Sequence, residues 1–254
     1  MNNNRNTEII RLLSETYGLT VKDLAKKLGV SEMTIRRDLK TLEKNGYVKF
    51  VSGAVFLQNN RYSFKASYSV KDNYDQQIAE KKSICKAAAS LITNGDIVYF
   101  DIGSTVPLVI DYLPEKCNIS ALCCTTSAFT RLYEKNIEKI TLLGGEYYRD
   151  LEMFFHSSNI QIIKSLRMTK AFISAAGIIG DDVTCINAIE SPIKKAVMVN
   201  AVENYLLVDS TKFGLVSPQI FASISDFSAI ITDSGVSEDI RRDYHERGIK
   251  LIIA

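Results

Sequence analysis

A polar loop near the middle of the chain has residue types that suit the binding of an anion. The apolar run IVYF leads into DIGST, residues 101–105. Gly103 permits a close approach of the backbone, and the Ser104 and Thr105 hydroxyls can donate hydrogen bonds to phosphate oxygens. Pro107 predicts a helix that starts just after the loop, and its dipole would favour an anion. Taken alone, however, Gly-Ser-Thr is a weak signal that ordinary turn chemistry explains more often than a phosphate site does.

Other apolar runs end in similar loops, and charged residues lie in or near them. ISALCC runs into TTSA, KITLL into GGEYYRD, AFISA into AGI, and YLLV into DSTKFG. If these runs are parallel strands, the loops share the carboxyl edge of one sheet, where open α/β folds bind ligands. Lys194 and Lys212 could then contact a phosphate, and Asp101, Glu190 and Asp209 could accept hydrogen bonds from sugar hydroxyls. For each of these charges singly, a surface position is an equal alternative.

Seven short, continuous, β-branched runs predict the strands of that sheet, which would be buried on both faces. They span residues 97–100, 119–124, 139–143, 171–175, 205–208, 229–232 and 250–254. A helix over residues 78–92 would precede the first of them, and helical segments such as 127–136 and 191–203 would form the crossovers. The predicted fold class of this part is therefore a mostly parallel α/β domain.

Adjacent arginines at positions 36 and 37 point to a second chemistry, the binding of nucleic acid. At about 100° per residue, Ile35, Leu39 and Leu42 fall on one stripe of a helix that Ser31 can cap. The opposite arc and its flanks, on which we place no acidic residue, carry Met33, Thr34, Arg36, Arg37, Lys40 and Lys44. Such a helix suits the major groove of DNA, although a charged face can also be merely solvated.

The surrounding segments support the nucleic-acid interpretation. Ile9, Leu12 and Leu13 predict a first helix, and a second begins at Thr20, where TVKD has the form of a capping box. A tight turn at LGV then leads to the helix with the arginines. NGYVKFVSGAVFL follows as two strands that resemble a wing, with Lys49 in the first. The pattern predicts a winged helix-turn-helix over residues 1–57.

Composition agrees with a small basic domain on a larger body. Of 254 residues, 46% are hydrophobic, which is ample for a sizeable core. Up to Leu57, ten basic residues face six acidic ones, a net charge of +4, whereas the remainder has 21 basic and 23 acidic residues, a net charge of −2. Only the first segment is therefore expected to meet a polyanion.

The expected location is the cytoplasm. The five cysteines have no metal-site spacing and lie mostly in apolar runs, which predicts reduced and buried thiols. We find no signal peptide and no run of the roughly 20 apolar residues that spans a bilayer, so we expect no membrane partner. Residues 58–77 predict a linker, but their four aromatic side chains suggest that part of it packs on the body.

The sequence resembles the DeoR family of bacterial transcription regulators. The stretch VSEMTIRRDLKTLEKNG matches nearly every position of the family's most distinctive motif, VS-x-x-TIRRDL-x-x-L-x-x-x-G. The wing departs from the family, with Lys49 in place of an Arg and SGA at residues 52–54 in place of Gly-Gly-Ala. By this resemblance, the DNA-binding residues are Ser31, Met33, Thr34, Arg36, Arg37, Lys40, Lys44 and Lys49.

The body resembles the family's carboxy-terminal sensor domain, which is related in fold to ribose-5-phosphate isomerase and glucosamine-6-phosphate deaminase. DIGST, AGI at 176–178 and DSTK at 209–212 match its effector-site motifs. This implies a phosphorylated sugar as effector, held by Asp101, Gly103, Ser104, Thr105, Thr126, Gly144, Gly145, Glu190, Lys194, Asp209 and Lys212. Two departures appear: Thr125, Thr126 and Ser127 stand where the family commonly has Thr-Asn, and Lys170 stands where it has an Asp.

Three functions follow as hypotheses. The first is a repressor of carbohydrate-metabolism genes that binds double-stranded operator DNA as a homodimer or homotetramer. The resemblance implies that the effector releases the DNA, whereas the residues leave that sign open. The second is a sugar-phosphate isomerase or deaminase, which would need a positioned base such as Asp101, Glu190 or Asp209, because His156 and His245 lie outside the matched motifs. The third is an oligomerisation module without a ligand. No cofactor or metal is expected in any case.

Overall fold

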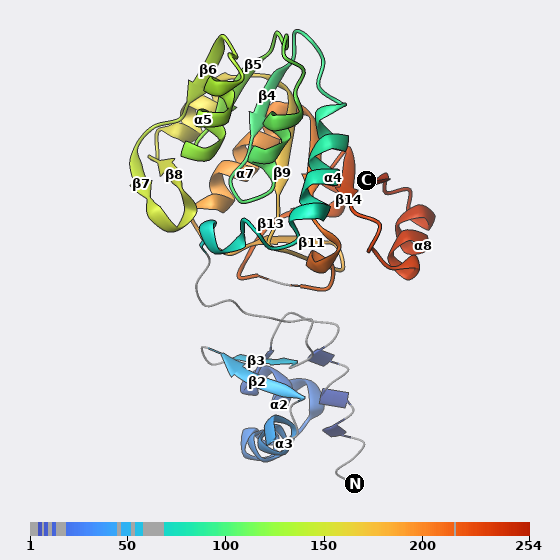
Figure 1. Cartoon of the computed structure of the whole chain (residues 1–254). Coiled ribbons are helices and arrows are strands. Elements are labelled where there is room, and N and C mark those ends of the chain that lie inside the picture. Colours follow the sequence, from blue (N-terminus) through green and yellow to red (C-terminus); the bar gives the residue numbers. More distant parts are fainter. Residues whose placement is uncertain are drawn as a thin grey trace. The chain divides into compact units, whose positions relative to one another are not determined.

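The structure of the protein is a computed structural model that describes residues 5–6, 8–9, 12–13, 19–44, 47–51, 54–57, 69–215 and 217–254. The chain divides into two compact units, Met1–Phe64 and Lys65–Ala254, and each is described by itself (Figure 1).

The first unit holds consecutive helices and a small antiparallel sheet. Its elements are β1 (Leu19–Thr20), α2 (Val21–Leu28), α3 (Glu32–Lys44), β2 (Val48–Val51) and β3 (Ala54–Leu57), and residues 5, 6, 8, 9, 12 and 13 are also helical. The strands are ordered β1-β3-β2, and β2 pairs with β3 as an antiparallel ribbon. The predicted helix, turn, helix and wing are therefore confirmed, except that Ser52 and Gly53 of the wing lie outside the described residues.

Local signals account for the ends of α2 and for the core of this unit. Thr20 and Asp23 form the predicted capping box: the Thr20 hydroxyl accepts from the Asp23 amide at 3.1 Å, and the Asp23 carboxylate accepts from the Thr20 amide at 3.2 Å. Gly29 ends the helix with φ +64°, a conformation that glycine adopts without strain. Ile35, Leu39 and Leu42 of α3 are buried in one core with residues of α2, β2 and β3.

The second unit is built on a seven-stranded sheet in which every neighbouring pair is parallel (Figure 1). Its order is β15-β14-β12-β9-β4-β5-β6. The strands are β4 (Ile97–Phe100), β5 (Ser120–Cys123), β6 (Lys139–Leu142), β9 (Met168–Ser174), β12 (Ala201–Leu207), β14 (Ala229–Thr232) and β15 (Leu251–Ile253). All seven predicted strands are present, and the predicted α/β fold class is confirmed.

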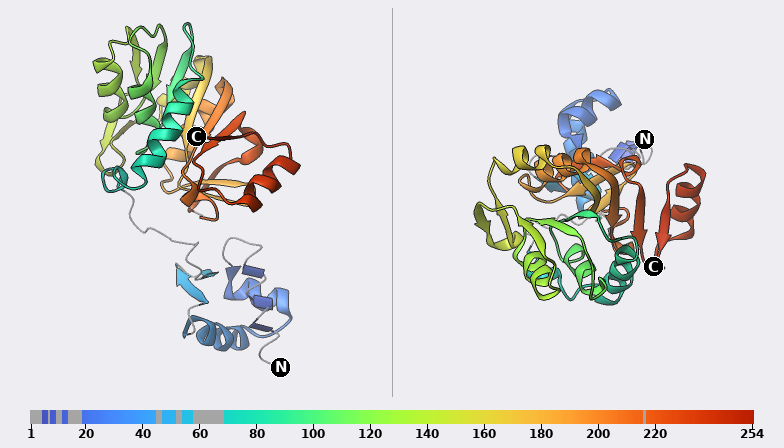
Figure 2. Two further views of the ribbon diagram at one scale, coloured as in Figure 1. Left: turned by 45° about the vertical axis from the view of Figure 1, so that its right-hand side comes forward. Right: turned by 90° about the horizontal axis from the view of Figure 1, so that it is seen from above.

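Helices cover both faces of this sheet, as the view from above in Figure 2 shows. Alternate residues of β4 enter separate cores: Val98 and Phe100 pack with α4 (Ile78–Ala89), the 3-10 helix η2 (Val106–Tyr112) and α5 (Thr126–Glu134). Tyr99 enters the core on the opposite face, which holds residues of α6 (Asn159–Ser165), α7 (Glu190–Asn200) and α8 (Glu238–Glu246). The strands are therefore buried on both sides, which explains their continuous apolar sequences.

Two predicted helical segments differ in the structure. The segment 191–203 is helical only to Asn200, because Ala201 is extended and begins the pairing of β12 with β9. The segment after DIGST forms η2, a 3-10 helix of seven residues with Pro107 at its start, rather than an α-helix. Its apolar residues are buried against α4 and α5, so tertiary packing decides its form.

Several small elements were not predicted. A hairpin joins β7 (Glu146–Tyr148) to β8 (Met153–Phe155), and a second sheet pairs β10 (Gly177–Ile179), β11 (Asp182–Cys185) and β13 (Gln219–Ser223). Single 3-10 turns occupy η1 (Lys71–Asn73), η3 (Arg149–Leu151), η4 (Ser210–Lys212) and η5 (Ile224–Asp226). Within the described residues, no helix is long and apolar enough to cross a membrane.

All five cysteines are free thiols, and four of them are buried, as the sequence predicted. Burial raises the pKa of Cys123, Cys124 and Cys185 to about 12, so these thiols stay protonated and unreactive at neutral pH.

Candidate functional site

The exposed side of α3 carries the basic residues that the sequence placed there. The side chains of Arg36, Arg37, Lys40 and Lys44 are exposed, while the stripe that begins at Ile35 is buried. Two acids do lie beside this arc, contrary to the prediction: Glu32 and Glu43 are both exposed, and the Glu32 carboxylate is 3.9 Å from the Arg36 guanidinium. Because both side chains are exposed, this pair is weak and leaves Arg36 able to meet a phosphate.

The amino-terminal turn of α3 presents hydroxyls and one long apolar side chain. The Ser31 and Thr34 hydroxyls hydrogen-bond to each other at 2.9 Å, and the Ser31 hydroxyl accepts from the Thr34 amide at 3.3 Å, so Ser31 caps the helix as predicted. Met33 is 76% exposed. At the end of a helix in a major groove, such a side chain can contact the methyl group of a thymine.

A partly buried ion pair connects α3 to the first helical segment of the chain. The Arg5 guanidinium donates to the Asp38 carboxylate at 2.5 Å, and Asp38 is almost fully buried. This hydrogen bond raises the pKa of Arg5. The sequence analysis did not identify Asp38 as a buried residue, although Asp38 is adjacent to Leu39 in the buried stripe of α3. Lys49 lies in β2 and is half-buried.

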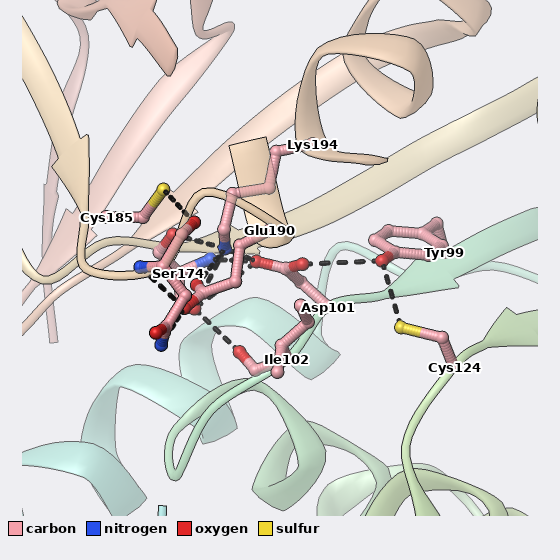
Figure 3. A network of polar contacts seen from close by, with 9 residues as sticks. Tyr99, Asp101, Ile102, Cys124, Ser174, Cys185, Glu190 and Lys194 are labelled. Carbon is pink, nitrogen blue, oxygen red and sulfur yellow. Dashed lines mark hydrogen bonds and ion pairs between the residues drawn. The ribbon is translucent and has the colours of Figure 1, made fainter. Parts of the chain in front are cut away.

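In the second unit, the carboxyl end of β4 leads into a fully buried ion pair (Figure 3). The Lys194 ammonium on α7 donates to the Asp101 carboxylate, and neither side chain is exposed. The same carboxylate accepts from the Ser174 amide at 2.9 Å and from its hydroxyl at 3.2 Å, and Lys194 also donates to the Ser174 carbonyl at 3.0 Å. The charges of Asp101 and Lys194 are thus satisfied inside the protein.

Glu190 completes this network one helical turn from Lys194. Its carboxylate is 3.9 Å from the Lys194 ammonium and accepts from the Asn187 side-chain amide at 3.0 Å. Burial raises the pKa of Glu190, an effect that Lys194 and Asn187 only partly offset. Burial would lower the pKa of Lys194, but Asp101 and Glu190 outweigh it, so the pKa is raised and the ammonium persists. These three residues hold β4, β9 and α7 together.

The DIGST loop meets a lysine that the sequence analysis missed. Gly103 has φ +110°, and Ser104 and Thr105 are largely buried. The Lys81 ammonium, on α4, donates to the Ser104 hydroxyl at 2.9 Å and to the Asn73 carbonyl. Burial lowers the pKa of Lys81 to about 8, an effect that the Asp209 charge opposes. Two of its three N–H groups therefore have acceptors, and no described residue accepts from the third.

A signal for Lys81 exists in the sequence. It lies on α4 at the start of a buried stripe that continues with Ile84, Cys85 and Ala88, the spacing i, i+3, i+4, i+7. A lysine on an apolar stripe has either to reach a polar partner or to remain unpaired in the core.

The DSTK loop contributes charge close to Lys81. Asp209 is buried and caps η4 by accepting from the Thr211 amide at 3.1 Å, and it also accepts from the Thr211 hydroxyl. The Lys212 ammonium, which is partly exposed, lies 3.8 Å from the Asp209 carboxylate. The Asp209 charge raises the pKa of Lys81 and the Lys212 charge lowers it. Both charges of this loop therefore act on the ammonium that contacts the DIGST loop.

The remaining predicted effector residues follow β5 and β6. Thr126 begins α5 and donates from its amide to the Glu152 carbonyl at 3.0 Å. Gly144 and Gly145 follow β6 and are exposed. Gly145 has φ +133°, and a Cβ there would lie 2.4 Å from the Phe155 backbone, so the position requires glycine. Because β4, β5 and β6 are parallel neighbours, these loops share the carboxyl edge of the sheet with DIGST.

Other residues singled out in the sequence lie elsewhere. Lys170 pairs with Asp96 at 2.6 Å near the amino ends of β9 and β4, at the opposite edge from DIGST. His156 and His245 are both exposed. In the described part of the chain, no three His, Cys, Asp or Glu side chains are grouped as a metal ion would need.

Comparisons with known proteins agree on one family over most of the chain. Residues 5–60 match the model of the DeoR-like helix-turn-helix domain, and residues 76–234 match the model of the DeoR C terminal sensor domain. The deoxyribose operon repressor of Escherichia coli is 31% identical over 246 residues, which cover 96% of both chains. The lactose phosphotransferase system repressor of Streptococcus mutans is 30% identical over 228 residues, 89% of this chain and 90% of that one.

Among solved structures, the matches include ribose 5-phosphate isomerase A from Methanocaldococcus jannaschii. The two chains are 19% identical, with a TM-score of 0.40 over 54% of this chain and 55% of the other. This likeness is too distant to bear on activity.

Proposed function

Because the chain belongs to the DeoR family of transcription regulators, we propose that it represses a carbohydrate-metabolism operon and that a phosphorylated sugar bound by the second unit controls its hold on DNA. The observation that carries the effector half of this proposal is Lys81, a buried ammonium that donates to Ser104 of the DIGST loop and has one N–H group to which no described residue offers an acceptor, so that an anion can accept from it.

The DNA contacts follow from the exposed arc of α3. Arg36, Arg37, Lys40 and Lys44 meet phosphates of the operator, while Met33 and the hydroxyls of the first turn reach base edges. Lys49 contacts the backbone from the wing. A single small domain of this kind buries limited surface on DNA, so we propose a dimer or tetramer that reads repeated half-sites.

The effector phosphate binds between DIGST and DSTK. Ser104 and Thr105 donate hydroxyl hydrogen bonds, the backbone at Gly103 permits close approach, and Lys81 and Lys212 supply positive charge. The sugar then extends toward Thr126 and the loop at Gly144 and Gly145, along the same edge of the sheet.

Three charged residues that the sequence analysis expected to contact the effector have a structural role in this proposal. Asp101, Glu190 and Lys194 are buried and bonded to one another, so we assign them to holding the strands and α7 in place beneath the ligand. Asp209 similarly orients its own loop through Thr211.

The same contacts argue against an isomerase or deaminase. Each carboxylate that could remove a proton from a sugar carbon, Asp101, Glu190 or Asp209, is buried and already accepts hydrogen bonds inside the protein. We therefore propose that the second unit binds sugar phosphates without converting them. Multiple turnovers of any sugar phosphate by the purified protein, abolished by Glu190→Gln, would favour the enzyme instead.

One experiment tests both halves of the proposal. Duplexes are selected from a randomised pool with the purified full-length protein, and the selected DNA is titrated with and without pentose 5-phosphates, hexose 6-phosphates and inorganic phosphate. The proposal expects sequence-specific binding and a change of affinity with at least one sugar phosphate. A parallel thermal-shift measurement tests the third hypothesis, an oligomerisation module without a ligand. If that hypothesis holds, no compound raises the melting temperature.

A further inference from the structure

Two sets of hydrogen bonds connect the segment that follows the DNA-binding unit in the chain to the proposed effector loops; each is called a tie below. Residues 69–77, the described part of the predicted linker, include η1 and pack on the second unit. Val70 is almost fully buried, and its amide donates to the Asp150 carbonyl at 2.9 Å. The expectation that part of the linker packs on the body is confirmed for these residues.

The first tie runs through Lys81. Its ammonium donates both to the Ser104 hydroxyl of the DIGST loop and to the Asn73 carbonyl in η1. One buried cation therefore joins a proposed phosphate ligand to the segment. An anion that approaches Ser104 can accept from the third N–H group of the same ammonium and shift its position relative to the Asn73 carbonyl.

The second tie runs through Glu152. The Tyr74 hydroxyl donates to the Glu152 carboxylate at 2.7 Å. The carbonyl of the same residue accepts from the Thr126 amide at 3.0 Å and from the Thr126 hydroxyl at 3.4 Å. Thr126 is a proposed sugar contact, so this tie also ends on the effector site. The pKa of Tyr74 is raised to about 12, first by burial and then by its hydrogen bond to Glu152, so the hydroxyl keeps its proton across the physiological range.

The backbone at Glu152 is in an unusual conformation for a residue with a side chain. Its φ is +49° and its ψ +31°, the left-handed region, between η3 and β8. Few residues with a side chain adopt this conformation, and those that do occur often at active sites, ligand clamps and switch regions. The contacts that fix Glu152 are those to Tyr74 and Thr126, together with its own amide, which donates to the Arg149 carbonyl at 3.2 Å.

We infer that Tyr74 and Glu152 are positioning residues that couple the effector site to the DNA-binding unit, in parallel with the tie from Lys81 to Asn73. The inference rests on the proposed function, because it needs a ligand at Ser104 and Thr126. A ligand that shifts Thr126 or draws on Lys81 changes how residues 69–77 are held, and these residues lead in the chain to the DNA-binding unit. Coupling of this kind typically changes affinity by about 5- to 150-fold.

The test separates effector binding from coupling. Tyr74→Phe removes one hydroxyl and leaves the ring, and Tyr133→Phe makes the same change at an exposed position of α5. Glu152→Ala removes the carboxylate acceptor, and Glu152→Gln retains an acceptor oxygen. Each variant and the wild type are assayed for the affinity of the active sugar phosphate, for the affinity of the selected duplex, and for the change that the sugar phosphate causes in the latter.

The expected result is a selective loss. Tyr74→Phe and Glu152→Ala should keep the sugar-phosphate affinity within about 2-fold and lower its effect on DNA affinity at least about 3-fold, whereas Tyr133→Phe and Glu152→Gln should behave like the wild type. If the sugar phosphate changes the DNA affinity of Tyr74→Phe as much as that of the wild type, this inference is overturned and the proposed function stands. A loss of sugar-phosphate affinity equal to the loss of coupling would overturn the inference too. A wild type that responds to no sugar phosphate would instead overturn the proposed function, and the inference with it.

Discussion

The buried ion pair of Asp101 and Lys194 makes a prediction about stability that can be worked from the contacts. In Lys194→Met the Asp101 carboxylate stays buried but loses its counter-charge. It keeps the Ser174 amide at 2.9 Å and the Tyr99 hydroxyl at 3.4 Å as donors. The single proton of the Ser174 hydroxyl is shared between this carboxylate at 3.2 Å and the Ile102 carbonyl at 2.6 Å. Removing one partner of a buried pair destabilises a protein by roughly 3–5 kcal/mol, and because these donors remain, we expect the lower end, about 3 kcal/mol.

The matched double variant distinguishes the charge from the lost packing. Asp101→Asn with Lys194→Met removes one charge of each sign, and the introduced carboxamide oxygen can still accept from the Ser174 amide. Glu190 keeps its Asn187 donor and, because burial raises its pKa, can take up a proton, so stability should return to within about 1 kcal/mol of the wild type. Urea unfolding followed by far-UV circular dichroism gives the shift of the midpoint. Hydrogen exchange of peptides that cover β4 and β9 assigns the change to the second unit.

Two outcomes would refute this reasoning. A loss below about 1 kcal/mol in Lys194→Met would mean that the ion pair contributes little to the fold. A double variant that is no more stable than the single one would mean that the aliphatic packing of Lys194, and not its charge, supports the sheet.

Four further predictions follow from single positions. Arg37→Ala should weaken binding to the selected duplex and lower the slope of log affinity against log salt by about 0.9, as one lost phosphate contact requires, with unchanged circular dichroism. Leu39→Asp should abolish binding at every salt concentration and lower the helical signal, because it places a charge in the core of the first unit. Lys81, whose pKa is about 8, loses its ammonium as pH rises through that value, so sugar-phosphate affinity measured by calorimetry should fall above pH 8 in the wild type but not in Lys81→Arg, which stays charged. Gly145→Ala should lower stability to urea by roughly 2 kcal/mol or more, because φ is positive and the facing strand β8 is too close, whereas Gly144→Ala, with open space around its Cβ, should change it little.

Most of the fold could be predicted because its signals are local. Each strand of the parallel sheet is a short apolar run bounded by turn residues, and α3 shows its buried stripe directly in the spacing of Ile35, Leu39 and Leu42. The small sheet of β10, β11 and β13 has no such signal. It depends on the pairing of residues 182–185 with residues 219–223, which lie far apart in the sequence.

The candidate site could be predicted in outline but not in its internal contacts. The loops that follow the strands identified the carboxyl edge of the sheet, and family resemblance identified the motifs within it. Asp101 and Lys194 are 93 positions apart, so nothing in the sequence indicated that they neutralise each other. Lys81 was missed because its helix was predicted only as an element that precedes the sheet and its side chains were not assigned, although a lysine on a buried stripe indicates an internal polar partner.

Fluorescence anisotropy of the selected duplex, titrated with wild-type protein at fixed salt in the presence and absence of each sugar phosphate, tests the central claim most directly. We predict that at least one sugar phosphate changes the affinity about 5-fold or more, that inorganic phosphate has a smaller effect, and that Lys81→Met abolishes the response while binding of DNA alone is retained. Equal affinity for the selected and a scrambled duplex, or a response that survives in Lys81→Met, would contradict the account.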